Sequence, residues 1–175
     1  MRYAAFISYS SADRRIGEEV QKAIEAYTVP APLRGQDFGQ GPVPKRIAPV
    51  FRDRSDADAS VDLSATLREA LAASDALIVL CSPASAGSVW VGEEIREFKR
   101  LGRGERIFPV LIDGLPECHD AGQQAQGGFH PSLFERWNAG SNRWEAEARE
   151  PLAPDVRATG DGLRFTVLKL VAALT

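Results

Sequence analysis

A chain of 175 residues with a formal net charge of −3 is long enough for one domain with a buried core, and that charge gives no electrostatic reason to expect a nucleic-acid or membrane partner. Its two cysteines, Cys81 and Cys118, have neither the number of a disulfide framework nor the spacing of a metal site, which fits a reducing compartment and predicts no metal. No apolar run reaches the length of a membrane span, and the first strand pattern begins too close to Met1 for a signal peptide, so we expect a cytoplasmic protein.

The first segments predict a strand followed by an amphipathic helix. Residues 3–8 have the pattern of a strand, and Ser10 with Asp13 three residues later resembles a helix N-cap arrangement. From Ile16 to Tyr27 apolar residues then recur at helical spacing, so we expect one face of this helix to be buried.

A long loop and a short strand follow. Residues 28–46 are rich in proline and glycine, which indicates a surface loop insertion. Residues 47–51 predict a second strand, and Pro49 favours an edge position because proline cannot donate to a ladder. The charged run that comes next begins with Arg52 and Asp53, and such runs are ordinarily solvated loops.

The middle of the chain predicts a helix, a central strand and another helix. Residues 62–74 place leucines on one face, with Asp62 or Ser64 available as a cap. Residues 76–81 are an unbroken apolar run, which is typical of a strand covered on both faces. A tight serine-rich and glycine-containing connection then leads into a segment whose apolar residues recur at helical spacing.

Helix geometry separates two adjacent glutamates in that last segment. At about 100° per residue, the apolar stripe that begins at Val91 has Trp90 and Glu94 on its flank, one turn apart, while Glu93 points roughly the opposite way. Glu94 is therefore the carboxylate expected at the rim of the core beside an indole, where partial desolvation is available. The alternative is a solvated helix glutamate beside a packing tryptophan.

The next strand and the irregular region beyond it are harder to predict. Residues 107–112 predict a buried strand, although Pro109 counts against full pairing on both of its edges. Residues 115–160 are irregular, and we expect His119 and His130 there to be surface residues rather than catalytic bases.

Three further elements complete the chain. A short helix is expected near residues 131–137 and a fifth strand near residues 152–157. Asp161 is the candidate cap of a final amphipathic helix over residues 163–174. The helical pattern reaches the last residues, which leaves open that the native chain continues beyond residue 175.

Strands alternating with helices predict an α/β fold of one domain over residues 1–175. We expect a flavodoxin-like five-stranded parallel sheet in the order 2-1-3-4-5, with helices on both faces. Ligands of such sheets bind outside the carboxyl ends of the strands where the order reverses, here between the first and third strands. The candidate binding residues at that place are Ser8, Tyr9, Ser10, Arg52, Asp53, Ser82 and Trp90, and Glu94 lies on the helix that follows.

Several familiar chemistries have no motif in this sequence. It contains no phosphate-cradling glycine-rich loop with lysine, no G-x-G-x-x-G after the first strand and no G-x-S-x-G elbow, and it has no cluster of histidine and cysteine for a metal. The paired acids that a phospho-acceptor domain needs after the first strand are also missing.

Three motifs, in order and with the right elements between them, resemble the Toll/interleukin-1 receptor (TIR) domain of the bacterial type. The first is Phe-Ile-Ser-Tyr-Ser at residues 6–10, and the second is Val-Phe-Arg-Asp-Arg at residues 50–54, which enters the family's BB loop. The third is the W-x-x-x-E element from Trp90 to Glu94. The resemblance covers residues 1–114 and extends to the final helix.

The resemblance implies one of two functions. Some TIR domains cleave the bond between nicotinamide and ribose in NAD⁺, which gives nicotinamide and ADP-ribose or a cyclic isomer, and they act as signalling or toxic modules in prokaryotic defence. Glu94 aligns with the glutamate that carries this activity, Trp90 would provide an aromatic wall, Ser8 and Tyr9 would line the nicotinamide end, and Arg52 would meet phosphate. In this reading NAD⁺ is the substrate and there is no cofactor.

The alternative is a non-catalytic scaffold whose partners are other TIR domains. Two departures from the family pattern bear on the choice. The BB loop, residues 54–63, has no glycine or proline, which argues against a receptor-like partner contact. The loop insertion and the irregular region also leave the outer wall of a substrate pocket unassigned. In related enzymes a neighbouring subunit completes the site, so we expect a homo-oligomer or filament on activation.

Overall fold

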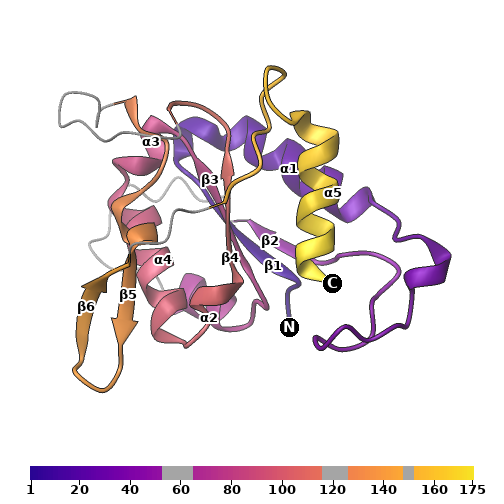
Figure 1. The fold of residues 1–175 in the computed structure, drawn as a ribbon, viewed down its shortest axis with the longest axis horizontal. Helices are drawn as coiled ribbons and strands as arrows, with labels where there is room; N and C mark the ends of the chain where they lie inside the picture. The colour runs from indigo at the N-terminus through magenta and orange to yellow at the C-terminus, as the bar shows by residue number, and fades with distance from the viewer. Residues whose placement is uncertain (53–64, 116–125, 148–151) are drawn as a thin grey trace.

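The computed structural model describes residues 1–52, 65–115, 126–147 and 152–175 (Figure 1). Its centre is a four-stranded parallel sheet in the order β2-β1-β3-β4. These strands are β1 (Ala5–Ser8), β2 (Val50–Arg52), β3 (Leu77–Cys81) and β4 (Ile107–Leu111). The order matches the first four positions of the predicted sheet, so the flavodoxin-like fold class is confirmed.

The central and edge strands have the positions that their sequences predict. All of β3 is buried, and it pairs with β1 on one side and β4 on the other. β2 is one of the two edge strands, and it begins three residues later than the predicted strand 47–51. Pro49 therefore lies just before it, where its carbonyl accepts a hydrogen bond of 2.9 Å from the N–H of Ala4. A proline at the start of an edge strand costs no ladder bond.

Pro109 explains why the fifth strand position is reduced to a single bridge among the described residues. The N–H of Ile112 donates to Cys81 in β3, whereas the N–H of Leu111 donates outward to the carbonyl of Pro154. Alternate residues of a strand face opposite edges, so Pro109 faces outward with Leu111 and cannot donate there. On this edge, β4 therefore pairs with the described residues of the following chain only through an isolated parallel bridge between Leu111 and Asp155. Asp155 lies within the range predicted for a fifth strand.

Two pairs of helices cover the two faces of the sheet (Figure 1). One face carries α1 (Arg14–Ala26) and α5 (Gly162–Leu174), and the other carries α2 (Ala65–Ala72) and α4 (Val89–Arg100). The stripe of α4 that the periodicity predicts, Val91, Ile95 and Phe98, is fully buried against Phe6, Leu77 and Val79 of the sheet. This burial fixes the orientation of α4. No described helix is long and apolar enough to cross a membrane.

The helix predicted near residues 131–137 is only partly correct. Residues Pro131–Phe134 form a 3-10 turn (η5), and the chain then enters a hairpin of β5 (Glu135–Asn138) and β6 (Arg143–Ala146). The hairpin forms because Trp137 pairs with Trp144 across the strands, with ring centroids 4.9 Å apart, and the Asn138 side chain accepts the turn amides of Gly140 and Ser141. It lies beside α4 (Figure 1).

The two predicted helix caps are not made by the expected side chains. A 3-10 turn, Ser11–Asp13 (η1), precedes α1, and neither Ser10 nor Asp13 caps through its side chain. The Asp161 side chain instead accepts hydrogen bonds from the N–H of Asp155 and the ammonium of Lys169. The caps predicted at Asp62 and Ser64 lie outside the described residues.

Three short helices complete the described part of the chain. The connection after β3 folds into α3 (Pro83–Ala86), which the sequence did not indicate. The loop insertion of residues 28–46 contains η2 (Ala31–Leu33), and its Val29 and Val43 are buried against the core. The third short helix, η3 (Gly104–Arg106), leads into β4.

Candidate active site

A buried pair of side chains joins β1 to α4. The hydroxyl of Ser8, at the end of β1, donates to Oε2 of Glu94 over 2.5 Å. Ser8 is 1% exposed and Glu94 is 7% exposed. Glu93, the next residue along the helix, keeps a side chain that is 39% exposed and pairs with Arg96. The separation of the two glutamates is therefore confirmed, and the alternative of a solvated Glu94 is wrong.

The sequence of α4 dictates where Glu94 lies. Ser88 is the N-cap, and its hydroxyl oxygen accepts the N–H of Val91 over 3.4 Å. Because Val91 and Ile95 are both fully buried, Glu94 is carried to the inner side of the helix rather than to solvent. Trp90, one turn earlier, is half-buried and packs on the edge of the same apolar cluster.

Tyr9 and Arg52 meet at the neighbouring strand end. Arg52 is 9% exposed, and its guanidinium donates 3.0 Å hydrogen bonds to the Tyr9 hydroxyl and to the Gln21 amide oxygen. It also lies 5.7 Å from the centroid of the Tyr9 ring. The same arginine lines a surface hollow of about 480 Å³ along α1, whose other lining residues are Arg14, Glu18, Gln21, Lys22 and Glu25.

Ser82 contacts a carboxylate that the sequence predicted as part of a helix cap and not as part of the site. Its hydroxyl donates to Oδ2 of Asp13 over 2.6 Å and accepts the N–H of Ser85, which caps α3. Burial raises the pKa of the Asp13 carboxyl, the Ser82 bond opposes this rise, and the negative charge of Asp113 adds to it. Asp13 could have been found as an acid in the loop after the first strand, at the ligand-binding edge.

The predicted candidates thus gather at the carboxyl ends of β1, β2 and β3, but as separate pairs. Ser8 contacts Glu94, Tyr9 contacts Arg52, and Ser82 contacts Asp13. Ser10 is half-buried at the start of η1. Asp53 lies outside the described residues. Within the part of the chain that the structure describes, no group of three or more His, Cys, Asp or Glu side chains could hold a metal.

His130 is not the surface residue that the sequence analysis predicted. It is half-buried against α4, and its Nδ1 accepts the N–H of Ser132 over 3.0 Å. The ring also makes a hydrogen bond to the backbone of Ser88. Burial lowers the pKa of His130, the charge of Arg96 lowers it further, and Glu135 opposes both. His119 lies outside the described residues.

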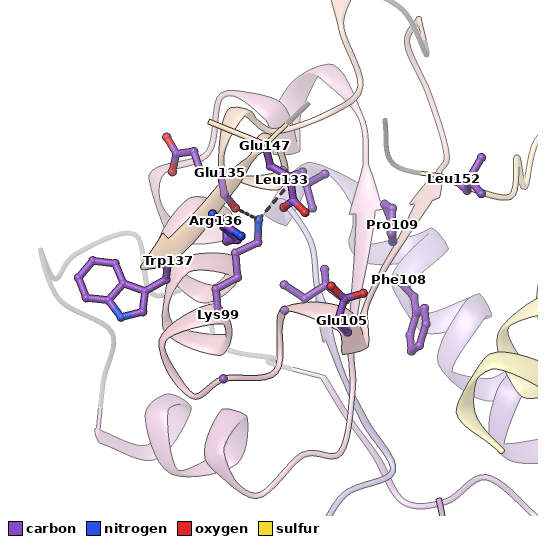
Figure 2. Close-up of a pocket in the computed structure, with 13 residues that line it drawn as sticks. Lys99, Glu105, Phe108, Pro109, Leu133, Glu135, Arg136, Trp137, Glu147 and Leu152 are labelled. Atoms are coloured by element: carbon purple, nitrogen blue, oxygen red, sulfur yellow. Dashed lines mark hydrogen bonds between the residues drawn. The ribbon is translucent and has the colours of Figure 1, made fainter. Parts of the chain in front are cut away.

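A cavity of about 400 Å³ lies at the opposite, amino end of β4 (Figure 2). Glu105, Ile107 and Phe108 line it, and Glu94 does not. Figure 2 shows its lysine, Lys99, turned toward the backbone of η5 and β5, where it donates to the carbonyls of Ser132, Leu133 and Glu135. The Lys99 ammonium thereby holds η5 and the hairpin against α4. Because Glu94 does not line the cavity, the cavity is separate from the candidate site.

The comparison with family models identifies the class of protein. The model of the TIR domain matches residues 5–152. The chain therefore belongs to the TIR domain family, as its three motifs indicate.

A curated relative and a solved structure are similar to parts of the chain. The NAD(+) hydrolase ApTIR of Actinoplanes sp. strain SE50/110 is 32% identical over 115 residues, which are 65% of this chain and 14% of that protein. The chain thus spans about one seventh of the length of this relative. The TIR domains in a structure of the activated Roq1 resistosome, which directly recognises the pathogen effector XopQ, match with a TM-score of 0.41 at 20% identity, over 64% of this chain and 58% of that one.

The raised pKa of Asp13 gives a test of its environment. When the pKa of a carboxyl is higher in the folded state than in the unfolded state, its charged form lowers the free energy of unfolding. The protonated form does not lower it. Asp13→Asn keeps an acceptor for Ser82, so we expect its Tm to exceed that of the wild type at pH 7 by on the order of 1–2 °C after solvent screening, and by less at pH 4.5. Thermal unfolding of both proteins at the two pH values measures this. A variant that is less stable than the wild type at pH 7 contradicts it.

Proposed function

We propose that this TIR domain is an NAD⁺ nucleosidase in which Glu94 is the catalytic carboxylate. The observation that carries the proposal is the buried Ser8–Glu94 pair at the point where the strand order reverses. The 32% identity to a protein named as an NAD(+) hydrolase supports the same reaction class. Burial of an ionisable group in a ligand crevice, with a specific partner to hold it, is the usual arrangement of a working carboxylate.

The chemistry needs one well-placed negative charge. When the bond between ribose C1′ and the nicotinamide nitrogen breaks, its electron pair returns to the pyridinium ring, which leaves as neutral nicotinamide. The ribosyl group becomes an oxocarbenium-like cation until water adds to C1′ and loses a proton. A carboxylate beside C1′ stabilises this cation, and no general acid is needed for the leaving group.

The proposed roles of the other residues follow from their contacts. Ser8 holds the Glu94 carboxylate, a positioning role that replaces the predicted contact with nicotinamide. Trp90 provides an aromatic wall beside the cation. Arg52, fixed by Tyr9 and Gln21, is a preorganised cation for a phosphate of NAD⁺. Ser10 and Ser82 complete the proposed lining of the crevice, and the predicted role of Asp53 lies outside the described residues.

Three finer features belong to the same proposal. The domain acts as a signalling or toxic module in prokaryotic defence, its activity rises when copies assemble, and its product is ADP-ribose or a cyclic isomer. Chromatography of the products separates the linear and cyclic compounds. A concentration series of the enzyme shows whether the specific activity depends on assembly.

The two adjacent glutamates of α4 provide a matched test of the catalytic role. Glu94→Gln keeps the shape and an acceptor for Ser8 but removes the charge, so we expect nicotinamide release to fall by about 100-fold or more. Glu93→Gln changes a half-exposed carboxylate on the same helix and should leave the rate within about twofold. Nicotinamide release from NAD⁺ is followed at high protein concentration. Equal rates in the wild type and Glu94→Gln would exclude the assigned role.

The hydroxyl of Ser8 is tested separately from the carboxylate. A hydrogen bond to a charged group contributes about 1.5–3 kcal/mol, so Ser8→Ala should lower kcat by roughly 10- to 100-fold if the bond orients Glu94 in the transition state. KM should change much less, since the hydroxyl is turned toward Glu94. If KM rises in Ser8→Ala while kcat stays constant, the positioning role is wrong and the result favours the predicted contact between Ser8 and the substrate.

The second candidate function is TIR–TIR interaction without catalysis. The observation that favours it is on α5, where Phe165 is 62% exposed and Leu168 is 37% exposed on one helix face. This function predicts self-association, measured by light scattering, that Phe165→Ser weakens and Glu94→Gln leaves unchanged, without loss of NAD⁺. Nicotinamide release that Glu94→Gln abolishes argues for the first function instead.

A further inference from the structure

The first turn of α4 carries the N-cap Ser88 and Trp90, and the next turn carries Glu94. Their inner side is fixed by Val91 and Ile95, which are buried against the sheet. The other support of this turn comes from His130, which lies far along the chain in the segment that precedes η5.

Gly92 makes the close approach of His130 possible. A Cβ added at Gly92 would lie 2.5 Å from Cε1 and 2.8 Å from Nε2 of the His130 ring. These distances are shorter than any van der Waals contact, so the imidazole rests directly on the helix backbone at the one residue without a side chain. The glycine is therefore explained by packing, although glycine disfavours a helix interior.

The imidazole uses its two nitrogens to join two elements. Nδ1 accepts the N–H of Ser132 and caps η5. Since Nδ1 is an acceptor, Nε2 is the nitrogen that donates to the carbonyl of Ser88. That carbonyl also accepts the N–H of Gly92 over 3.2 Å, so His130 adds a second hydrogen bond to the first carbonyl of α4.

The surroundings of His130 lower its pKa. Arg96 of α4 and Glu135 of β5 are the charged groups that act on it, and burial with the Arg96 charge lowers its pKa. The Nδ1 atom is already engaged by the N–H of Ser132, and the bond to the Ser88 backbone engages the ring on its other side. These contacts favour a structural role for the ring.

From this geometry we infer that His130 is a positioning residue: seated on Gly92, it fixes the first turn of α4 through the Ser88 carbonyl and so sets the place of Trp90 and Glu94. The inference rests on the proposed function for its kinetic consequence. Its structural content, the rigidity of the first turn, is independent of that function.

Two conservative variants separate this role from simple capping. The oxygen of His130→Asn reproduces Nδ1 and keeps the cap on η5, whereas the amide nitrogen of His130→Gln reproduces Nε2 and keeps the bond to Ser88. We expect His130→Gln to retain kcat within about threefold and His130→Asn to lose about tenfold, with KM similar in both, because misplacement of a catalytic group lowers the rate more than the affinity. The reverse order, or two variants equal to the wild type in kcat, overturns the inference.

A glycine substitution tests the same contact from the other side. Gly92→Ala displaces the ring, so it should lower both kcat and Tm, and it should add little to His130→Asn in the double variant. Gly17→Ala in α1 is the matched control, since its added Cβ meets its neighbours at ordinary distances of 3.5 Å or more. Alanine there should raise Tm. A rise in Tm on Gly92→Ala contradicts the proposed contact.

Hydrogen exchange distinguishes failure of the inference from failure of the proposed function. The amide of Gly92, bonded to the Ser88 carbonyl, should exchange faster in His130→Asn than in the wild type or in His130→Gln. If the wild type releases no nicotinamide in any assembled state, the proposed function fails, and this measurement still decides whether His130 fixes the turn. Equal protection in all three proteins overturns the inference.

Discussion

The placement of the Glu94 carboxylate in the core rim is the constraint on which the rest of the site depends. An ionised carboxylate taken from water costs several kcal/mol unless hydrogen bonds replace its solvent, and the Ser8 hydroxyl supplies one of them. That bond requires the end of β1 and the second turn of α4 to be adjacent. The buried stripe of α4 secures this from within, and His130 on Gly92 secures it from the outer side.

A second constraint, the missing N–H of Pro109, shapes the molecule away from the site. Because the outward edge of β4 cannot form a full ladder, the chain after residue 152 makes only a bridge there before it enters α5. The β5–β6 hairpin is held instead against α4, by Lys99 and by Arg100, which lies over both tryptophan rings. Pro109 of β4 and Leu152 both line the cavity at the amino end of β4 (Figure 2).

The sequence was informative where periodicity and topology decide the outcome. Helical spacing alone distinguished Glu94 from Glu93, and the strand-order rule placed Ser8 beside it. Neither rule describes which side chains bond to each other, so the partners of Ser82 and Arg52 were not predictable. Asp13 and Asp161 resembled caps, yet tertiary hydrogen bonds took their side chains. The hairpin was hidden because its pairing depends on Trp137 and Trp144 meeting across a turn, a contact that no single-segment pattern contains.

The electrostatics of the carboxyl edge bear on the kind of molecule that the crevice accepts. Burial raises the pKa of the Asp13 carboxyl at this edge, and the negative charge of Asp113 raises it further. Glu94 on α4 is also buried. The charged form of a carboxyl held in a partly dry position becomes more favourable when a cation lies close to it. Under the proposed function, the nicotinamide ring of NAD⁺ is such a cation before cleavage, and the ribosyl group becomes one during it. In that proposal, negative charge at this edge stabilises the transition state more than the product, which is neutral at both of the separated atoms.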